Sequence, residues 1–147
     1  MLPAPETALH VSVDDEPDPT DRQVVVDGLL RFNIGFIGDP HFAPLGVFVR
    51  DAMGDVVGGL VGHTRWEWLY VEKLWLPDEL RGRGLGSRLL RAAESRARER
   101  GCRGVYLDTF EYQALPFYQK LGYELFGTLD DFPPGYRQFY LRKRLDP

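Results

Sequence analysis

The chain has 147 residues, 44% of them hydrophobic, which is enough for one well-buried core and too little for two ordinary domains. Its net charge of -4 and pI near 5.4 argue against general binding to nucleic acid or to a membrane surface, because phosphate groups recruit basic proteins. The single cysteine excludes an intramolecular disulfide and a cysteine metal cluster, and we expect no metal site. We therefore expect one domain over residues 1–147, and the absence of a signal-peptide pattern or long apolar run predicts a cytoplasmic protein.

The first quarter of the chain is predicted to contain a strand and then a helix. We expect residues 1–6 to be frayed. Apolar and polar residues alternate over 9–13, which predicts a strand with one buried face. Asp18 then stands before Pro19 as a candidate N-cap, and the helix that follows runs to about Phe36.

Three further strands are predicted over 45–50, 56–65 and from 66 or 68 to 76. A hairpin connection at 51–55 makes the first two antiparallel. The third strand is mostly apolar on both faces, which is typical of a central strand covered on both sides. One of its faces carries Trp68, Tyr70, Glu72, Leu74 and Leu76. Glu72 is therefore a candidate carboxylate for a buried site or a cleft, unless it only pairs with a nearby cation.

A glycine-rich turn follows at 80–90. Gly82, Gly84 and Gly86 allow several consecutive N–H groups to point at one ligand, and the next helix adds its own first-turn N–H groups. The turn predicts an anion cradle, or else only a tight connection between a strand and a helix. The turn lacks the Gly-Lys-Ser/Thr that ends a phosphate-binding loop of the Walker type, which argues against hydrolysis of a Mg-nucleotide. A dinucleotide fingerprint needs its third glycine one position later, although Asp108 lies at the distance of a ribose-binding acid.

The second half predicts a mixed α/β (α+β) fold. Leu85, Leu89, Ala93 and Ala97 form an apolar row on the helix after the turn, while Glu94 pairs with Arg98 on its water-facing side. A strand over 102–109 should lie parallel to the third strand through a right-handed crossover. A short helix over 114–122 and closing strands over 123–127 and 136–141 complete a sheet of six or seven strands.

Two motifs on these elements resemble those of the GNAT superfamily of acetyl-CoA-dependent N-acetyltransferases. Arg81-Gly82-Arg83-Gly84-Leu85-Gly86 fits the Gln/Arg-x-x-Gly-x-Gly/Ala pyrophosphate motif. The stretch 114–123 is similar to the second signature, Ala-x-x-Phe-Tyr-x-x-x-Gly-Phe/Tyr. Their separation and the order of elements agree with the family over nearly the whole chain.

The resemblance implies a mixed central sheet whose two parallel strands splay apart and receive the pantetheine arm. It implies a backbone N–H, by analogy that of Leu74, that hydrogen-bonds the acetyl carbonyl. Tyr118 matches the tyrosine that protonates the leaving thiolate. The residues implied for acetyl-CoA are Leu74, Trp75, Leu76, Arg81, Gly82, Arg83, Gly84, Leu85, Gly86, Ser87, Thr109 and Tyr118.

The base is not marked by a motif. Glu72, two positions before Leu74, could accept the proton of an ammonium or hold a cationic substrate, whereas His63 and His41 are weaker candidates. Glu111 stands where many members carry an Asn that contacts the pantetheine arm, so Thr109 or Gln113 is a substitute for that contact. Cys102 is expected to be a buried strand thiol rather than a nucleophile.

The sequence thus predicts direct transfer of an acetyl group from acetyl-CoA to a primary amine of a small molecule or peptide. A catalytically silent acyl-CoA-binding module and, through Asp108, a nucleotide-binding domain remain alternatives. No nucleic acid or membrane partner is expected. A homodimer through the C-terminal strand, interpreted as exposed, is compatible with the pattern.

Overall fold

The computed structural model describes residues 8–146, so the expected fraying of residues 1–6 lies outside the described part. The chain divides into two compact units, residues 1–39 and residues 40–147, which are described separately. A single domain over 1–147 stays a prediction. None of the helices within residues 8–146 is both long enough and apolar enough to span a bilayer.

Within the described residues of the first unit, the chain forms the α-helix α1 (Pro19–Ile37), as predicted. The Asp18 side chain accepts a hydrogen bond from the Thr20 N–H at 2.7 Å, so it caps the helix as expected. The predicted strand over residues 9–13 is wrong, because these residues form neither helix nor strand. Alternation favours a strand only where a neighbouring strand can pair with it, and within the described residues the sheet pairs only segments after Pro40.

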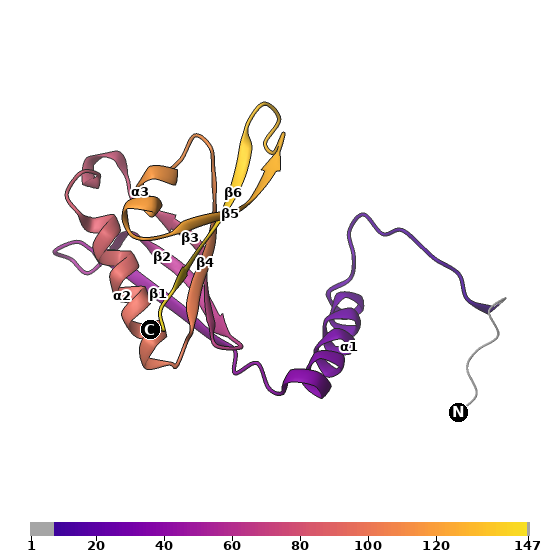
Figure 1. Ribbon diagram of the computed structural model, residues 1–147. Helices are drawn as coiled ribbons and strands as arrows, with labels where there is room; N and C mark the ends of the chain where they lie inside the picture. The colour runs from indigo at the N-terminus through magenta and orange to yellow at the C-terminus, as the bar shows by residue number, and fades with distance from the viewer. Residues whose placement is uncertain (1–7, 147) are drawn as a thin grey trace. The chain divides into compact units, whose positions relative to one another are not determined.

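The second unit is a six-stranded mixed sheet in the order β1-β2-β3-β4-β6-β5. Only β3 and β4 run parallel, as predicted, and the other pairs are antiparallel. The helix α2 packs across β1, β2 and β3 (Figure 1). The elements are β1 (Ala43–Arg50), β2 (Val56–Arg65), β3 (Trp68–Trp75), a short 3-10 helix η2 (Asp78–Leu80), α2 (Leu85–Glu99), β4 (Gly104–Phe110), α3 (Leu115–Lys120), β5 (Glu124–Asp130) and β6 (Arg137–Arg144).

The C-terminal strand is not an edge of this sheet. β6 lies between β4 and β5, so the sheet edges are β1 and β5. The interpretation of β6 as an exposed strand is therefore wrong. Its hydrogen-bonding groups face a strand on each side, because the chain returns through the β5–β6 hairpin to pair with β4.

The core side of α2 agrees with the predicted apolar row, with one correction. Leu89, Ala93 and Ala97 are buried, but Glu94 is also only 3% exposed instead of facing water. Its carboxylate accepts hydrogen bonds from the Tyr123 hydroxyl at 2.6 Å and from Lys143 Nζ at 3.0 Å. The favourable spacing of Glu94 and Arg98 along the helix is outweighed by two tertiary partners that satisfy a buried carboxylate.

A β-bulge in β3 changes which side chains face the core. Val71 pairs with Gly62 of β2, but the next pair joins Lys73 to Val61, so Glu72 is an extra residue without a partner on β2. Alternation therefore reverses at Glu72. Leu74 and Leu76 join the core with Leu69 and Val71, and the prediction that Glu72 and Leu74 share a face is wrong.

Candidate active site

The cleft of the protein lies where β3 and β4 stop pairing. The two strands pair from Trp68 with Gly104 to Val71 with Leu107, whereas β3 continues to Trp75. β4 keeps its pairing with β6 to Phe110, so the open hydrogen-bonding positions face the gap. A cavity of about 1000 Å³ occupies this gap and extends between α2 and α3. The splayed parallel pair agrees with the sequence-based expectation.

The glycine-rich turn forms one wall of the cleft. Gly82 and Gly84 both have φ +76, a left-handed conformation that explains the choice of glycine, and Gly84 is the N-cap of α2. No side chain caps this helix end, so its first-turn N–H groups face the turn. Arg81 donates from Nε to the Leu76 carbonyl oxygen at 3.0 Å, which joins the turn to the end of β3.

Nearly all of the residues expected to hold acetyl-CoA line this cleft. They include Leu74, Trp75, Leu76, Arg81, Gly82, Gly84, Leu85, Gly86, Ser87, Thr109 and Tyr118. Arg83 does not belong to the lining residues. Gly86 packs closely against α3, since a methyl group on it would lie 3.2 Å from the Phe117 ring, which would have to shift slightly to admit it.

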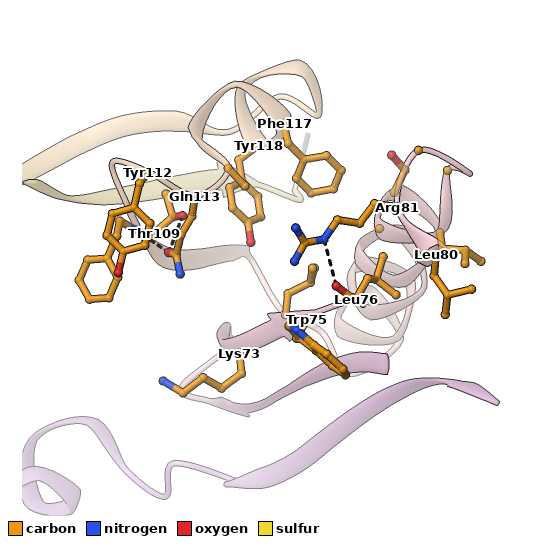
Figure 2. A pocket seen from close by; sticks show the side chains of 18 of the residues that line it. Lys73, Trp75, Leu76, Leu80, Arg81, Thr109, Tyr112, Gln113, Phe117 and Tyr118 are labelled. Atoms are coloured by element: carbon orange, nitrogen blue, oxygen red, sulfur yellow. Dashed lines mark hydrogen bonds between the residues drawn. The ribbon is translucent and has the colours of Figure 1, made fainter. Parts of the chain in front are cut away.

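Tyr118 comes from α3 and is 6% exposed. Figure 2 shows its hydroxyl and the Arg81 guanidinium pointing into the same space from opposite sides of the cleft. Burial, with a contribution from the nearby Asp108 carboxylate, raises the pKa of Tyr118 to about 12. The phenol therefore remains protonated and able to donate a proton at neutral pH.

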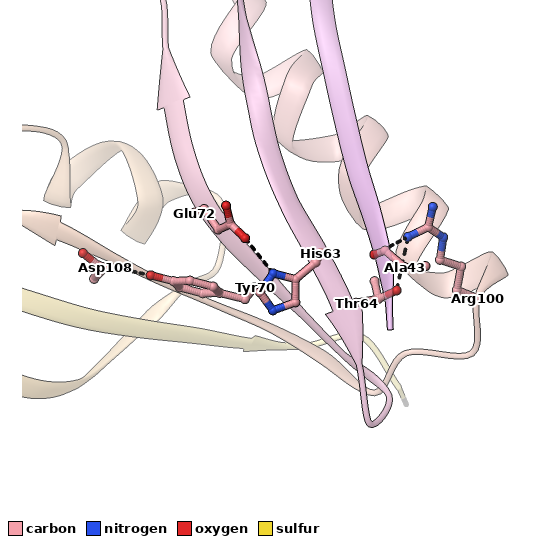
Figure 3. A network of polar contacts seen from close by, with 7 residues as sticks. All are labelled: Ala43, His63, Thr64, Tyr70, Glu72, Arg100 and Asp108. Atoms are coloured by element: carbon pink, nitrogen blue, oxygen red, sulfur yellow. Dashed lines mark hydrogen bonds and ion pairs between the residues drawn. The ribbon is translucent and has the colours of Figure 1, made fainter. Parts of the chain in front are cut away.

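Glu72 also lines the cleft, on the side toward β2. Its Oε1 lies 2.6 Å from Nδ1 of His63, and its side chain is 43% exposed (Figure 3). No sequence motif places His63 beside Glu72. The pairing of β2 with β3 sets His63 opposite Tyr70, and the bulge brings Glu72 within reach of the imidazole.

Asp108 is the first residue of the open part of β4 and is held from two sides. The Tyr70 hydroxyl donates to one carboxylate oxygen at 2.8 Å, and Gln138 Nε2 donates to the other at 2.9 Å. Burial and the hydrogen bond to Asp108 raise the pKa of Tyr70. Each oxygen of Asp108 thus accepts one hydrogen bond from within the protein, and Asp108 also lines the cleft.

Glu111 lies outside the cleft lining and pairs with Arg137 at 2.6 Å, and the hydrogen bond from Arg137 lowers the pKa of Glu111. Thr109 and Gln113 line the cleft instead of Glu111, as the sequence suggested for the contact made by the family Asn. Gln113 Oε1 accepts hydrogen bonds from Thr109 Oγ1 at 3.1 Å and from the Phe110 N–H at 2.7 Å. The amide nitrogen of Gln113 is thereby left for a ligand in the cleft.

Sequence reasoning missed several other lining residues. Lys73, Phe110 and Tyr112 carry no motif, and only their positions beside the splayed strands could have indicated them. Cys102 is buried, as predicted, and precedes β4 at the end far from the open positions. Burial raises the pKa of its thiol, which argues against a nucleophilic role.

Comparison with known proteins agrees with this geometry. Residues 11–123 match the model of the acetyltransferase (GNAT) family. The chain belongs to the GNAT acetyltransferase family. The GNAT chain is 47% identical over 106 residues to blasticidin-S acetyltransferase of Streptomyces morookaense, covering 69% of this chain and 78% of the relative. It is 36% identical over 136 residues to an acetyltransferase of Agrobacterium fabrum, covering 92% of this chain and 99% of the relative.

The fold of this GNAT protein is also found in a solved structure. The crystal structure of an acetyltransferase from Bacillus cereus superposes with a TM-score of 0.86 at 28% identity, covering 94% of this chain and 99% of that one. The expected GNAT-like fold is thereby confirmed.

Proposed function

We propose that this GNAT protein transfers the acetyl group of acetyl-CoA to a primary amine of a small molecule, by direct attack while both substrates are bound. The observation that supports it most is the arrangement of one cleft between the open edge of β3, the glycine turn and Tyr118. Each feature matches one chemical part of the reaction: an extended amide-bearing arm, a pyrophosphate and a leaving thiolate.

The residues of the cleft fit acetyl-CoA. Gly82 and Gly84 leave no Cβ in the turn, and the uncapped N–H groups of α2 suit a pyrophosphate. The backbone of Leu74, Trp75 and Leu76 lies beyond the last β3–β4 pair and suits the amides of a pantetheine arm. When bound, acetyl-CoA supplies an activated acyl group on a thioester.

Two side chains are suited to the proton transfers. Tyr118 keeps its proton at neutral pH and is placed to give it to the leaving thiolate. Glu72, on the opposite wall, is suited to take the proton that the substrate ammonium must lose before its nitrogen can attack. A backbone N–H of the open part of β3, by analogy that of Leu74, stabilises the charge on the carbonyl oxygen.

The test is an acetylation assay with the full chain. Thiol release from acetyl-CoA is followed with a panel of amines, and the acetylated product is identified by mass spectrometry. Blasticidin S is the first acceptor to test, because the Streptomyces relative is named as its acetyltransferase. Peptides with a free N-terminal amine are a second class. We expect thiol release that depends on one class of amine and falls sharply in Tyr118→Phe.

Two results would favour another function. Tight binding of acetyl-CoA without thiol release above its slow hydrolysis would indicate the catalytically silent module. Calorimetry that shows binding of NAD but not of CoA would contradict both readings and restore the nucleotide-binding one.

A further inference from the structure

His63 is the residue in direct contact with the proposed base that the mechanism above does not use. Its Nδ1 lies 2.6 Å from Glu72 Oε1, and its side chain is 16% exposed. An ionised carboxylate only accepts hydrogen bonds, so the proton of this bond lies on Nδ1. The other carboxylate oxygen of Glu72, Oε2, is left for a second partner.

The imidazole ring is itself held in place. The Phe42 ring packs at 5.0 Å from it, and the Tyr70 ring meets it edge-on at 5.8 Å. Tyr70 in turn is fixed by its hydrogen bond to Asp108 and by a stacked contact with Tyr106 at 4.7 Å. His63 therefore presents Nδ1 in one direction, as Figure 3 shows.

Glu72 needs such a contact because of the bulge. As the extra residue of β3, it has no residue opposite it on β2. Its side chain is also 43% exposed, so packing alone leaves its direction open. The hydrogen bond from His63 is the contact that selects one rotamer of the carboxylate.

We propose that His63 is a positioning residue that holds Glu72 toward the acceptor amine, and that the charge state of His63 sets the lower pH limit of the reaction. This inference rests on the proposed function and names the control of its base. His63 does not itself touch the acceptor; it acts through Glu72.

The proton balance explains the pH limit. The ammonium gives one proton to Glu72 Oε2, and its nitrogen forms the C–N bond to the carbonyl carbon. The C–S bond breaks and the thiolate takes the proton of Tyr118, while the second proton of the nitrogen passes to the Tyr118 phenolate, which leaves a neutral amide. An imidazolium at His63 stabilises the charged carboxylate, which lowers its affinity for the ammonium proton. Neutral His63 is therefore the active form. The acid limb of the pH profile, that is, the fall of kcat toward low pH, is set by the His63–Glu72 pair as a whole.

Other ionisable groups belong to the segments around the His63–Glu72 pair. Tyr70 on β3 and Asp108 on β4 share a hydrogen bond, and Lys73 follows Glu72. His41 adjoins Phe42, whose ring packs on His63. His41→Asn is the matched control, because it removes another imidazole but leaves the hydrogen bond between His63 and Glu72 in place, and Asn tolerates the positive φ of this position.

The experiment compares kcat and kcat/KM from about pH 5.5 to 9 for the parent, His63→Gln, His63→Ala and His41→Asn. We expect His63→Ala to lower kcat about 10-fold to 100-fold at all pH values, with the KM for acetyl-CoA unchanged. His63→Gln should recover most of kcat, because its amide can donate to Glu72. Its acid limb should move to lower pH, because only the carboxylate remains to titrate. His41→Asn should keep the parent limb.

Three results would overturn the inference: parent-like kcat and pH profile in His63→Ala, no recovery in His63→Gln, or an unmoved limb in His63→Gln. If His63→Ala does not fold, the pH at which the acid limb of His63→Gln lies still tests the inference. A parent that is inactive with every amine would contradict the proposed function instead. An active parent whose limb ignores His63 would contradict this inference alone.

Discussion

Gly62 is the residue of β2 that makes the bulge at Glu72 sterically possible, so its replacement by Ala tests the architecture of the site. A methyl group on Gly62 would overlap the Tyr70 carbonyl oxygen and lie 3.1 Å from the Tyr70 carbonyl carbon and 3.2 Å from Val71 Cα. Ordinary carbon–carbon contacts need about 3.5–4.0 Å. These neighbours are backbone atoms, so β2 and β3 must move apart rather than rotate a side chain.

The expected cost of Gly62→Ala follows from that overlap. Overpacking typically costs about 1–3 kcal/mol, and the involvement of backbone places this change near the upper end. At about 2–4 °C per kcal/mol for a chain of this size, 3 kcal/mol lowers the melting temperature by about 6–12 °C. We also expect kcat to fall, because the movement displaces both Tyr70 and Glu72.

The assay is thermal unfolding followed by circular dichroism, together with kcat on the best acceptor. Gly127→Ala is the matched control, since Gly127 also lies at a register shift, in β5, but a methyl group there would be 3.7 Å from Tyr140 Cβ. This is an ordinary contact, and we expect a melting temperature close to the parent's. The reasoning is refuted if Gly62→Ala melts and reacts like Gly127→Ala.

Three further predictions concern the acid, the buried carboxylate and the turn. Tyr118→Phe should lower kcat by about 100-fold or more. Because the pKa of Tyr118 is raised to about 12, its protonated form persists above the ordinary range, so the parent rate should not fall between about pH 8 and 10; a fall there would exclude Tyr118 as the acid. Glu94→Ala should destabilise the fold by about 3 kcal/mol in urea unfolding, because it leaves the partly buried Lys143 without its partner, and Glu94→Gln should cost less. In calorimetry with CoA, Arg81→Ala should weaken binding by about 10-fold, as expected for a lost charged contact, whereas Arg83→Ala, outside the cleft lining, should have a smaller effect; equal effects would contradict this assignment.

Much of the fold could be predicted because local signals and tertiary structure agree. The capped helix at Asp18, the hairpin at 51–55 and the parallel crossover through α2 each depend on residues close in sequence. The glycine turn and Tyr118 could be placed on their elements for the same reason. Their meeting in one cleft followed from the parallel order of β3 and β4 together with the family resemblance.

The failures come from contacts between distant segments. Nothing near Glu72 in the sequence marks an extra residue in β3, since the bulge depends on Gly62 ten positions earlier. Glu94 has the spacing of a surface helix residue, yet Tyr123 and Lys143 satisfy it in the core. The alternation at 9–13 lacks a partner strand among the described residues. Rules based on local patterns use one segment at a time, so they contain no information about these distant partners.

The parting of β3 and β4 also gives the protein an edge strand in the middle of its own sheet. Its unpaired backbone N–H and C=O groups can form hydrogen bonds with any extended peptide, including the same segment of another copy. Lys73 stands exposed on this open stretch, between Glu72 and Leu74, where a charge discourages such pairing. Aggregation on heating should therefore begin at a higher temperature when acetyl-CoA is present, and at a lower one in Lys73→Val.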